Sequence, residues 1–158
     1  MRTLLFVLGI AVASGQTPEK DPLQPFGFLL GKWNGAGGGQ PGSGSGAFSF
    51  EAGLDRHILV RHNYAQYDGA ILRHDDLLIV YLEDGPRAIY FDSEGHVIRY
   101  RVSIPQAGSV VFESDGSQPG ARYRLSYVLK GAALEGTFEI AESASAPYQT
   151  YLNWTAKK

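Results

Sequence analysis

The charge balance and the absence of cysteine exclude several classes of protein before any motif is considered. The 158 residues include 14 basic and 16 acidic side chains, so no net field favours nucleic acid or an anionic membrane surface. Without cysteine the chain has no disulfide framework and no thiolate chemistry, and its length suits one domain with one core.

The N-terminus has the pattern of a secretory signal. Arg2 precedes an apolar stretch and then three small residues. The apolar stretch is shorter than the roughly 20 residues of a membrane-spanning helix, so residues 1–15 are predicted to be a cleaved signal peptide. A buried N-terminal strand or helix is the alternative. Residues 16–25 are predicted to form a tether, and residues 26–158 one β-barrel domain. We expect a secreted or periplasmic protein with no membrane span.

The domain has the pattern of an antiparallel barrel. Turn signals recur roughly every eight to twelve residues, and apolar and polar residues alternate between them. The glycine-rich residues 35–46 are either a flexible loop or a weak strand that turns at residues 40–42. The strand 148–154 is expected to close the barrel beside the strand of Trp33. We predict an all-β, up-and-down barrel of about 8–10 strands.

Alternation along the strands assigns side chains to faces. In the strand that begins at Ile58, His62 and Tyr64 share a face with Val60, which is predicted to be the inner face. In the strand that His96 opens, Tyr100 shares the inner face.

Two later segments, 99–102 and 122–125, carry their arginines on the opposite face from their apolar residues. The arginines are therefore predicted to stand outside the barrel. Arg122 and Arg124 are expected to lie opposite Glu135 and Glu139 of the next strand, and an anion-binding arginine site is the alternative.

The segment Leu77–Leu82 is apolar on both faces. Such a strand is covered by its own protein on both sides, or a second subunit packs on its outer face. A homodimer through this strand therefore stays open as an alternative.

Two histidines are candidates for chemistry. An inward His62 and an inward His96 would converge in the barrel interior, where an imidazole can bind a metal or transfer a proton. Hydrogen-bonded core histidines are the alternative. His74 lies in a polar segment and is expected in a solvated loop. No histidine spacing indicates a metal site, and no nucleophile elbow indicates a hydrolase, so no metal and no catalytic residue are assigned.

The segment FLLGKWNGAGGG at residues 28–39 resembles the opening of calycin-like barrels. Its G-x-W element, residues 31–33, is shared with lipocalins, and its continuation resembles that of nitrobindin-type haem-binding barrels. The latter resemblance implies haem held by a histidine near the C-terminal strand. The last histidine here is His96, and residues 151–156 contain none. The chain is more similar to exported barrels of the DUF1579 kind.

Together these observations predict an exported barrel that binds a small apolar or amphipathic ligand in its interior. A haem-binding or cofactor-dependent enzyme that uses an interior histidine and a dimeric interaction module are the alternatives, and the sequence identifies no cofactor. The residues expected to contact the ligand are His62, Tyr64, His96, Tyr100 and Trp154.

Overall fold

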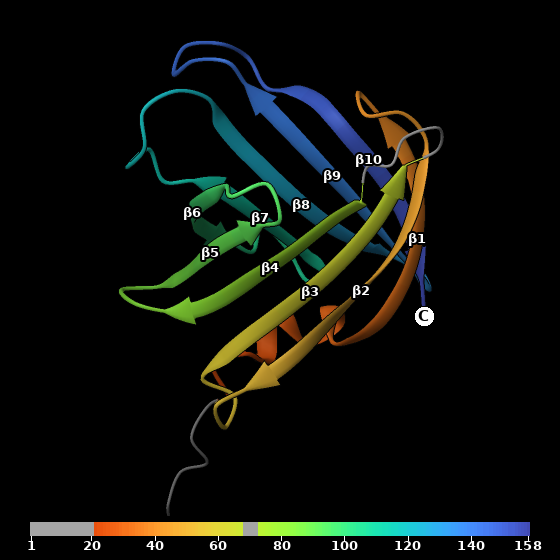
Figure 1. The fold of residues 1–158 in the computed structure, drawn as a ribbon. Coiled ribbons are helices and arrows are strands. Elements are labelled where there is room, and N and C mark those ends of the chain that lie inside the picture. Colours follow the sequence, from red (N-terminus) through yellow and green to blue (C-terminus); the bar gives the residue numbers. More distant parts are fainter. Residues whose placement is uncertain (1–20, 68–72) are drawn as a thin grey trace, which may run out of the picture.

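The computed structural model describes residues 21–67 and 73–158, and in these residues ten antiparallel strands close into a barrel (Figure 1). Successive strands are neighbours around the barrel, and the last pairs with the first. This confirms the predicted all-β, up-and-down barrel. The strands are β1 (Gly31–Gly39), β2 (Gly44–Gly53), β3 (Ile58–Tyr67), β4 (Arg73–Leu82), β5 (Pro86–Asp92), β6 (Val97–Ser103), β7 (Ser109–Ser114), β8 (Arg122–Lys130), β9 (Ala133–Ala141) and β10 (Gln149–Lys157).

The glycine-rich segment is a strand, β1, and the chain turns after Gly39. The second of the two alternatives for this segment is therefore correct. Gly37 lies opposite Trp154 of β10, and a Cβ atom on Gly37 would collide with the backbone oxygen of Asn153. Glycine therefore lets the two strands approach closely where the barrel closes.

One end of the barrel is closed by the 3-10 helix η1 (Gln24–Leu29), which lies below the strands in Figure 1. Its Phe26 and Leu29 are buried in the barrel core. The indole Nε1 of Trp33 donates a hydrogen bond to the carbonyl oxygen of Leu29 at 2.7 Å. This bond ties η1 to β1 and satisfies a buried donor. Within the described residues, no helix is long and apolar enough to span a bilayer.

The described part of the predicted tether, residues 21–25, is folded against the barrel. Leu23 is buried in the core, and Gln24 already belongs to η1, so the C-terminal part of residues 16–25 is folded. Apolar residues beside a proline look like a linker in the sequence, but here they fill the end of the barrel. The predicted signal peptide, residues 1–15, lies outside the described residues.

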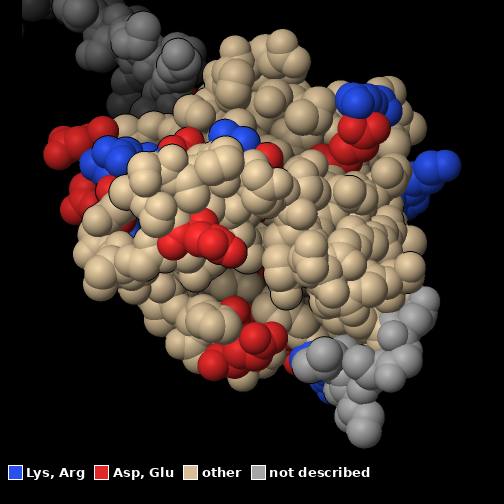
Figure 2. Space-filling view, turned by 90° about the horizontal axis from the view of Figure 1, so that it is seen from above, with Lys and Arg blue, Asp and Glu red and all other residues tan. Residues whose placement is uncertain are grey.

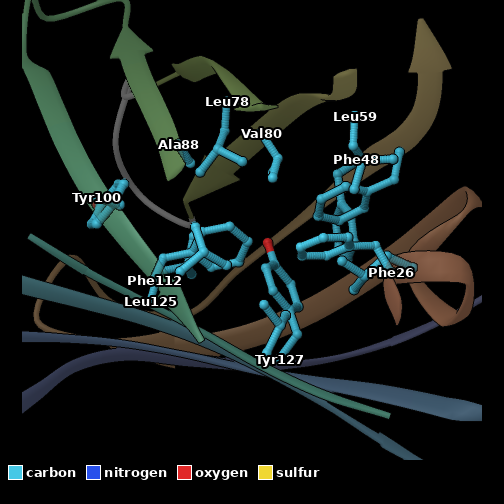
Figure 3. Close-up of a cluster of buried hydrophobic side chains, with 14 of the residues drawn as sticks. Phe26, Phe48, Leu59, Leu78, Val80, Ala88, Tyr100, Phe112, Leu125 and Tyr127 are labelled. Atoms are coloured by element: carbon cyan, nitrogen blue, oxygen red, sulfur yellow. The ribbon is translucent and has the colours of Figure 1, made fainter. Parts of the chain in front are cut away.

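The half of the barrel next to η1 is filled by large apolar side chains. Figure 3 shows Tyr127 between Phe112 and Phe48, with its hydroxyl pointing toward the centre of the cluster. The ring of Tyr127 meets the ring of Phe50 edge to face, with centroids 5.5 Å apart. Further fully buried members of this core are Leu59, Val80, Ala88, Val110 and Leu134.

The face assignment of β3 is opposite to the predicted one. Leu59 and Arg61 are buried inside the barrel, whereas His62 and Tyr64 are exposed on its outer surface. The prediction followed the apolar residue Val60, which is only half-buried and faces outward. The buried charge of Arg61 is tolerated because an acidic side chain of β4 pairs with it. The alternation of residues along β3 alone does not reveal this partner.

The segment Leu77–Leu82 forms part of β4. Leu78 and Val80 face the core, while Leu77 and Ile79 are half-buried on the outer side. Leu77 lies opposite Phe91 of β5, and Ile79 lies opposite Ile89 of the same strand. Apolar neighbours therefore cover part of this outer face.

The outer arginines match their prediction in part. Arg124 lies opposite Glu139 and donates two hydrogen bonds to its carboxylate, at 2.6 and 2.9 Å. Arg122 instead donates to the backbone oxygens of Ser143 and Ala146. The strand register places Arg122 opposite Ala141, which offers no carboxylate.

Candidate functional site

The half of the barrel away from η1 contains a cavity of about 440 Å³. Figure 2, which looks onto this open end, shows the hollow with acidic side chains beside it. The cavity exists because the inward residues of β1, β2 and β3 are small near this end. Near the closed end, the inward residues of the same strands include phenylalanine and leucine. These small lining residues are Gly35, Gly37, Gly44, Gly46 and Ala65.

One wall of the cavity is apolar. It is formed by inward side chains of β8, β9 and β10, among them Leu125, Phe138, Ile140 and Leu152. These side chains, apart from buried Leu125, are half-buried because their inner surfaces face the cavity rather than protein atoms. Apolar surface left open in this way is the usual lining of a small-molecule site.

Trp154 of β10 completes the apolar wall, and a glycine determines how it lies. Gly136 is its direct partner on β9, and a Cβ atom at this glycine would overlap the indole. The ring therefore lies against the backbone of β9. It also meets the ring of Tyr127 edge to face, with centroids 5.7 Å apart. Trp154 thus joins the cavity wall to the packed core below it.

The floor of the cavity contains a buried ion pair. Arg61 of β3 and Asp76 of β4 are 4% and 9% exposed, and Arg61 Nη2 donates to Asp76 Oδ2 at 3.3 Å. The same carboxylate oxygen accepts a hydrogen bond from Asn63 Nδ2 at 2.8 Å. The guanidinium of Arg61 also lies 5.8 Å from the ring centroid of Phe48 and 5.9 Å from that of Tyr127.

These contacts decide the charge of Asp76. Burial opposes ionisation, but the charge of Arg61 and a hydrogen bond from His74 outweigh it and hold the pKa of Asp76 below its ordinary range. Both members of the floor pair are therefore charged at neutral pH.

A second polar group stands above this floor. His74 Nε2 lies 3.0 Å from the hydroxyl of Tyr90 and 3.3 Å from Asp76 Oδ2, and its Nδ1 lies 3.2 Å from Glu94 Oε1. The hydrogen bond with Asp76, opposed by burial and aided by the bond with Glu94, raises the pKa of His74. Burial raises the pKa of Tyr90, so its hydroxyl stays protonated.

The turn between β5 and β6 forms part of the cavity mouth. Asp92 Oδ2 lies 2.8 Å from His96 Nδ1, and Asp92 Oδ1 accepts the backbone N–H groups of Glu94 and His96. Gly95 has a φ of 90°, which the tight turn requires. This turn is tied to β4 because Ser93 Oγ accepts the backbone N–H of Asp75.

The structure divides the predicted ligand-contact residues into two groups. His96, Tyr100 and Trp154 line the cavity, whereas His62 and Tyr64 do not. His62 and His96 therefore do not converge, because His62 points away from the interior. The predicted contact of the other three residues with a ligand stays a prediction.

Sequence reasoning missed the residues that make the polar wall. His74, expected in a solvated loop, lies on β4 and faces the cavity. Asp76 shares its strand face with the buried Leu78 and Val80. This alternation along the strand could have predicted that Asp76 faces inward. Arg61 was assigned to the outside because it alternates with Val60 and His62, which were predicted to face inward. Its buried position depends on Asp76, 15 residues further along the chain.

A resident metal finds no ready set of ligands in the part of the chain that the structure describes. No group of three or more histidine, aspartate or glutamate side chains there is arranged to hold an ion. Of the two histidines that line the cavity, His74 has both ring nitrogens beside protein oxygens. Binding a metal or a haem iron through His74 would require one of these contacts to break.

Solved structures with a similar fold include that of a lyase. The structure of the S-type phycobiliprotein lyase CPES from Guillardia theta matches with a TM-score of 0.51 and 8% sequence identity, over 89% of this chain and 98% of that chain. At this identity the likeness shows the fold alone, and it supports the predicted calycin-like barrel. No protein-family model matches the chain, and no curated protein matches it significantly.

Proposed function

We propose that this protein binds a small amphipathic molecule in the open half of its barrel. The observation that carries the proposal is the two-sided cavity, with an apolar wall on β8, β9 and β10 and a polar wall on β3, β4 and β5. Its volume of about 440 Å³ lies within the range of roughly 300–1,000 Å³ that is typical of small-molecule sites.

The two walls suggest how such a molecule lies. Its apolar part would pack on Phe138, Leu152 and Trp154, where apolar side chains are only half-buried. Its polar part would face His74 and Tyr90 on the other side. Access is from the open end, because η1 and the packed core fill the opposite end.

The chain carries a natural reporter for this binding. It has two tryptophans, of which Trp154 lines the cavity and Trp33 lies buried beside η1. Titration with a neutral apolar dye such as N-phenyl-1-naphthylamine should change the emission of Trp154. The change should persist in Trp33→Phe and disappear in Trp154→Phe, while dye binding itself is measured from the dye's own emission. A dye that does not bind, or that binds without affecting Trp154, would contradict the proposed site.

A native mass spectrum of protein purified from its own host should show a bound small molecule lost on denaturation. The same sample tests the alternatives that remain. A Soret band would favour haem, and a dimer at high concentration would favour the predicted contact through Leu77–Leu82. A spectrum that shows the bare chain and no Soret band would leave the dye titration as the deciding measurement.

We further propose that the protein is exported, on the pattern of residues 1–15, and that it is related to barrels of the DUF1579 kind, on the pattern of residues 28–39. Fractionation of the host, with N-terminal sequencing of the mature protein, tests export. An uncleaved chain recovered from the cytoplasm would contradict it.

A further inference from the structure

We infer that the ligand's polar group is electrically neutral and carries both a hydrogen-bond donor and an acceptor, as a primary amide or an alcohol does. This inference rests on the proposed function and specifies the chemistry of the same cavity. It follows from the way the charges of the polar wall are paired and from the hydrogen-bonding capacity that remains in the floor.

Each acidic or basic side chain on the polar wall lies beside one of the opposite kind, within the wall or at its edge. The pairs and their separations are Arg61–Asp76 at 3.3 Å, His74–Glu94 at 3.2 Å, His96–Asp92 at 2.8 Å and Arg73–Asp75 at 2.9 Å. The wall is therefore polar, and none of its acidic or basic side chains stands alone to meet an incoming ion.

An ionised ligand would bind poorly to such a wall. A carboxylate on the ligand would lose its hydration. It would also be repelled by the carboxylates of Asp76 and Glu94, which already lie beside the basic groups of the wall. An ammonium group would meet Arg61 and His74 in the same way. A neutral polar group avoids the desolvation of a full charge, and it disturbs none of the existing pairs.

The Arg61–Asp76 pair also has one hydrogen-bond donor and one acceptor without a partner. Among the described residues, Arg61 Nε, a donor, and Asp76 Oδ1, an acceptor, have no hydrogen-bond partner. Both side chains line the cavity, and both are at least nine-tenths buried. Unpaired buried polar groups are unfavourable. Both atoms are covered by protein, so an amide or hydroxyl group on the ligand would accept from Arg61 and donate to Asp76 only after these side chains turn toward the cavity.

The experiment compares four probes that share one apolar body and differ only in the polar group. Decanamide, decan-1-ol, decanoate and decylammonium are each used to displace N-phenyl-1-naphthylamine from the protein at neutral pH. Decanamide and decan-1-ol should bind at least about tenfold more tightly than either ion. If decanoate or decylammonium binds as tightly as decanamide, the inference is overturned. If the dye and all four probes fail to bind, the proposed function itself is contradicted.

Variants test whether charge pairing sets this preference. Asp76→Asn removes the counter-charge of Arg61, so the ratio of decanoate to decanamide affinity should rise about tenfold. Asp55→Asn is the matched control, because Asp55 is an exposed carboxylate in the turn between β2 and β3 and does not line the cavity. It should leave the ratio unchanged.

A second variant keeps the test decisive if Asp76→Asn does not fold, as judged by circular dichroism. Glu94→Gln alters an exposed side chain at the mouth and removes one of the two carboxylates beside His74. It should raise the decanoate-to-decanamide ratio severalfold below the pKa of His74. An unchanged ratio in every folded variant of Asp76 and Glu94 would overturn the role assigned to the paired charges.

Discussion

The two halves of this barrel are built from the same strands but differ in what they hold. Beside η1, the inward positions of β1 and β2 carry Trp33 and Phe50, and the interior is filled. Further along the same strands, Gly37 and Gly46 occupy inward positions, and a cavity replaces the core. The size of the inward residue, not a change of strand pairing, therefore decides which half is packed and which is hollow.

The halves also differ in how they treat charge. The closed half buries aromatic and aliphatic side chains together with the ring of Tyr127. The open half places a connected set of charged groups, from Arg61 to His74, on one wall. The division suggests separate roles, with stability concentrated in the first half and recognition in the second.

Truncating one phenylalanine in each half should give the largest contrast. Phe50 is 1% exposed in the closed half, whereas Phe138 is half-buried on the cavity wall. Phe50→Ala should lower the free energy of unfolding by about 3–5 kcal/mol, because it leaves a void among packed rings. Phe138→Ala should lower it by about 1–2 kcal/mol, because its ring already faces open space.

Urea unfolding followed by circular dichroism measures both values. Dye binding should weaken in Phe138→Ala and persist in folded Phe50→Ala. Equal stability losses for the two variants would show that the cavity wall is packed as tightly as the core, and the comparison between the halves would fail.

Removing a buried counter-charge should have the next largest effect. Asp76→Asn leaves Arg61 buried without its partner and should destabilise the protein by about 3 kcal/mol, near the lower end for a broken buried pair because the amide keeps the shape and some hydrogen bonds. Asp75→Asn changes a partly exposed carboxylate on the other face of β4 and should change stability by less than about 0.5 kcal/mol. Similar losses in the two variants would mean that the floor pair is not desolvated.

The sequence was sufficient for the barrel because the signals for it are local. Turn residues, alternation and the G-x-W opening mark the strands, and the face of Trp154 indicated the closing strand. Each of these features depends on residues close together in the chain, and barrel closure follows once no strand edge is left open.

The polar wall could be predicted only in part because its positions depend on distant pairs. Tyr100 was placed correctly, since its strand alternates cleanly between apolar and arginine residues, whereas His96, expected to open this strand, lies in the exposed turn before it. On β3 the alternation is ambiguous, because Val60 is apolar but faces outward while Arg61 is charged but faces inward. Only the contact with Asp76 resolves this, and strand register is not visible in a single sequence.

The open half should also account for the pH dependence of stability near neutrality. The pKa of His74 is raised above 6.5 in the folded protein, mainly by Asp76. Its ion pairs therefore stabilise the fold fully at a pH below the pKa of His74 in the unfolded chain. This contribution is lost as the pH rises through the pKa of His74 in the folded protein. The lowered pKa of Asp76 acts in the other direction, because its contribution is lost only as the pH falls through a value below 3.8.

Stability should therefore fall as the pH rises from 6 to 8, and His74→Gln should flatten the slope. His62→Gln, at an exposed outward position on β3, is the matched control and should retain the slope of the parent protein. Urea midpoints measured at several pH values provide the test. A slope that survives His74→Gln would place the responsible group outside the cavity.

The smallest expected effect comes from a charge pair on the outside of the open half. Arg124 donates two hydrogen bonds to Glu139, and its guanidinium lies 4.1 Å from the ring centroid of Tyr148. The geometry is better than that of the floor pair, yet water reaches it, with Arg124 34% exposed. A double-mutant cycle with Arg124→Ala and Glu139→Ala should therefore give a coupling of about 0.2–1 kcal/mol that weakens at high salt. A coupling as large as the loss in Asp76→Asn would show that burial does not distinguish the inner pair from the outer one, since the outer pair has the shorter contacts.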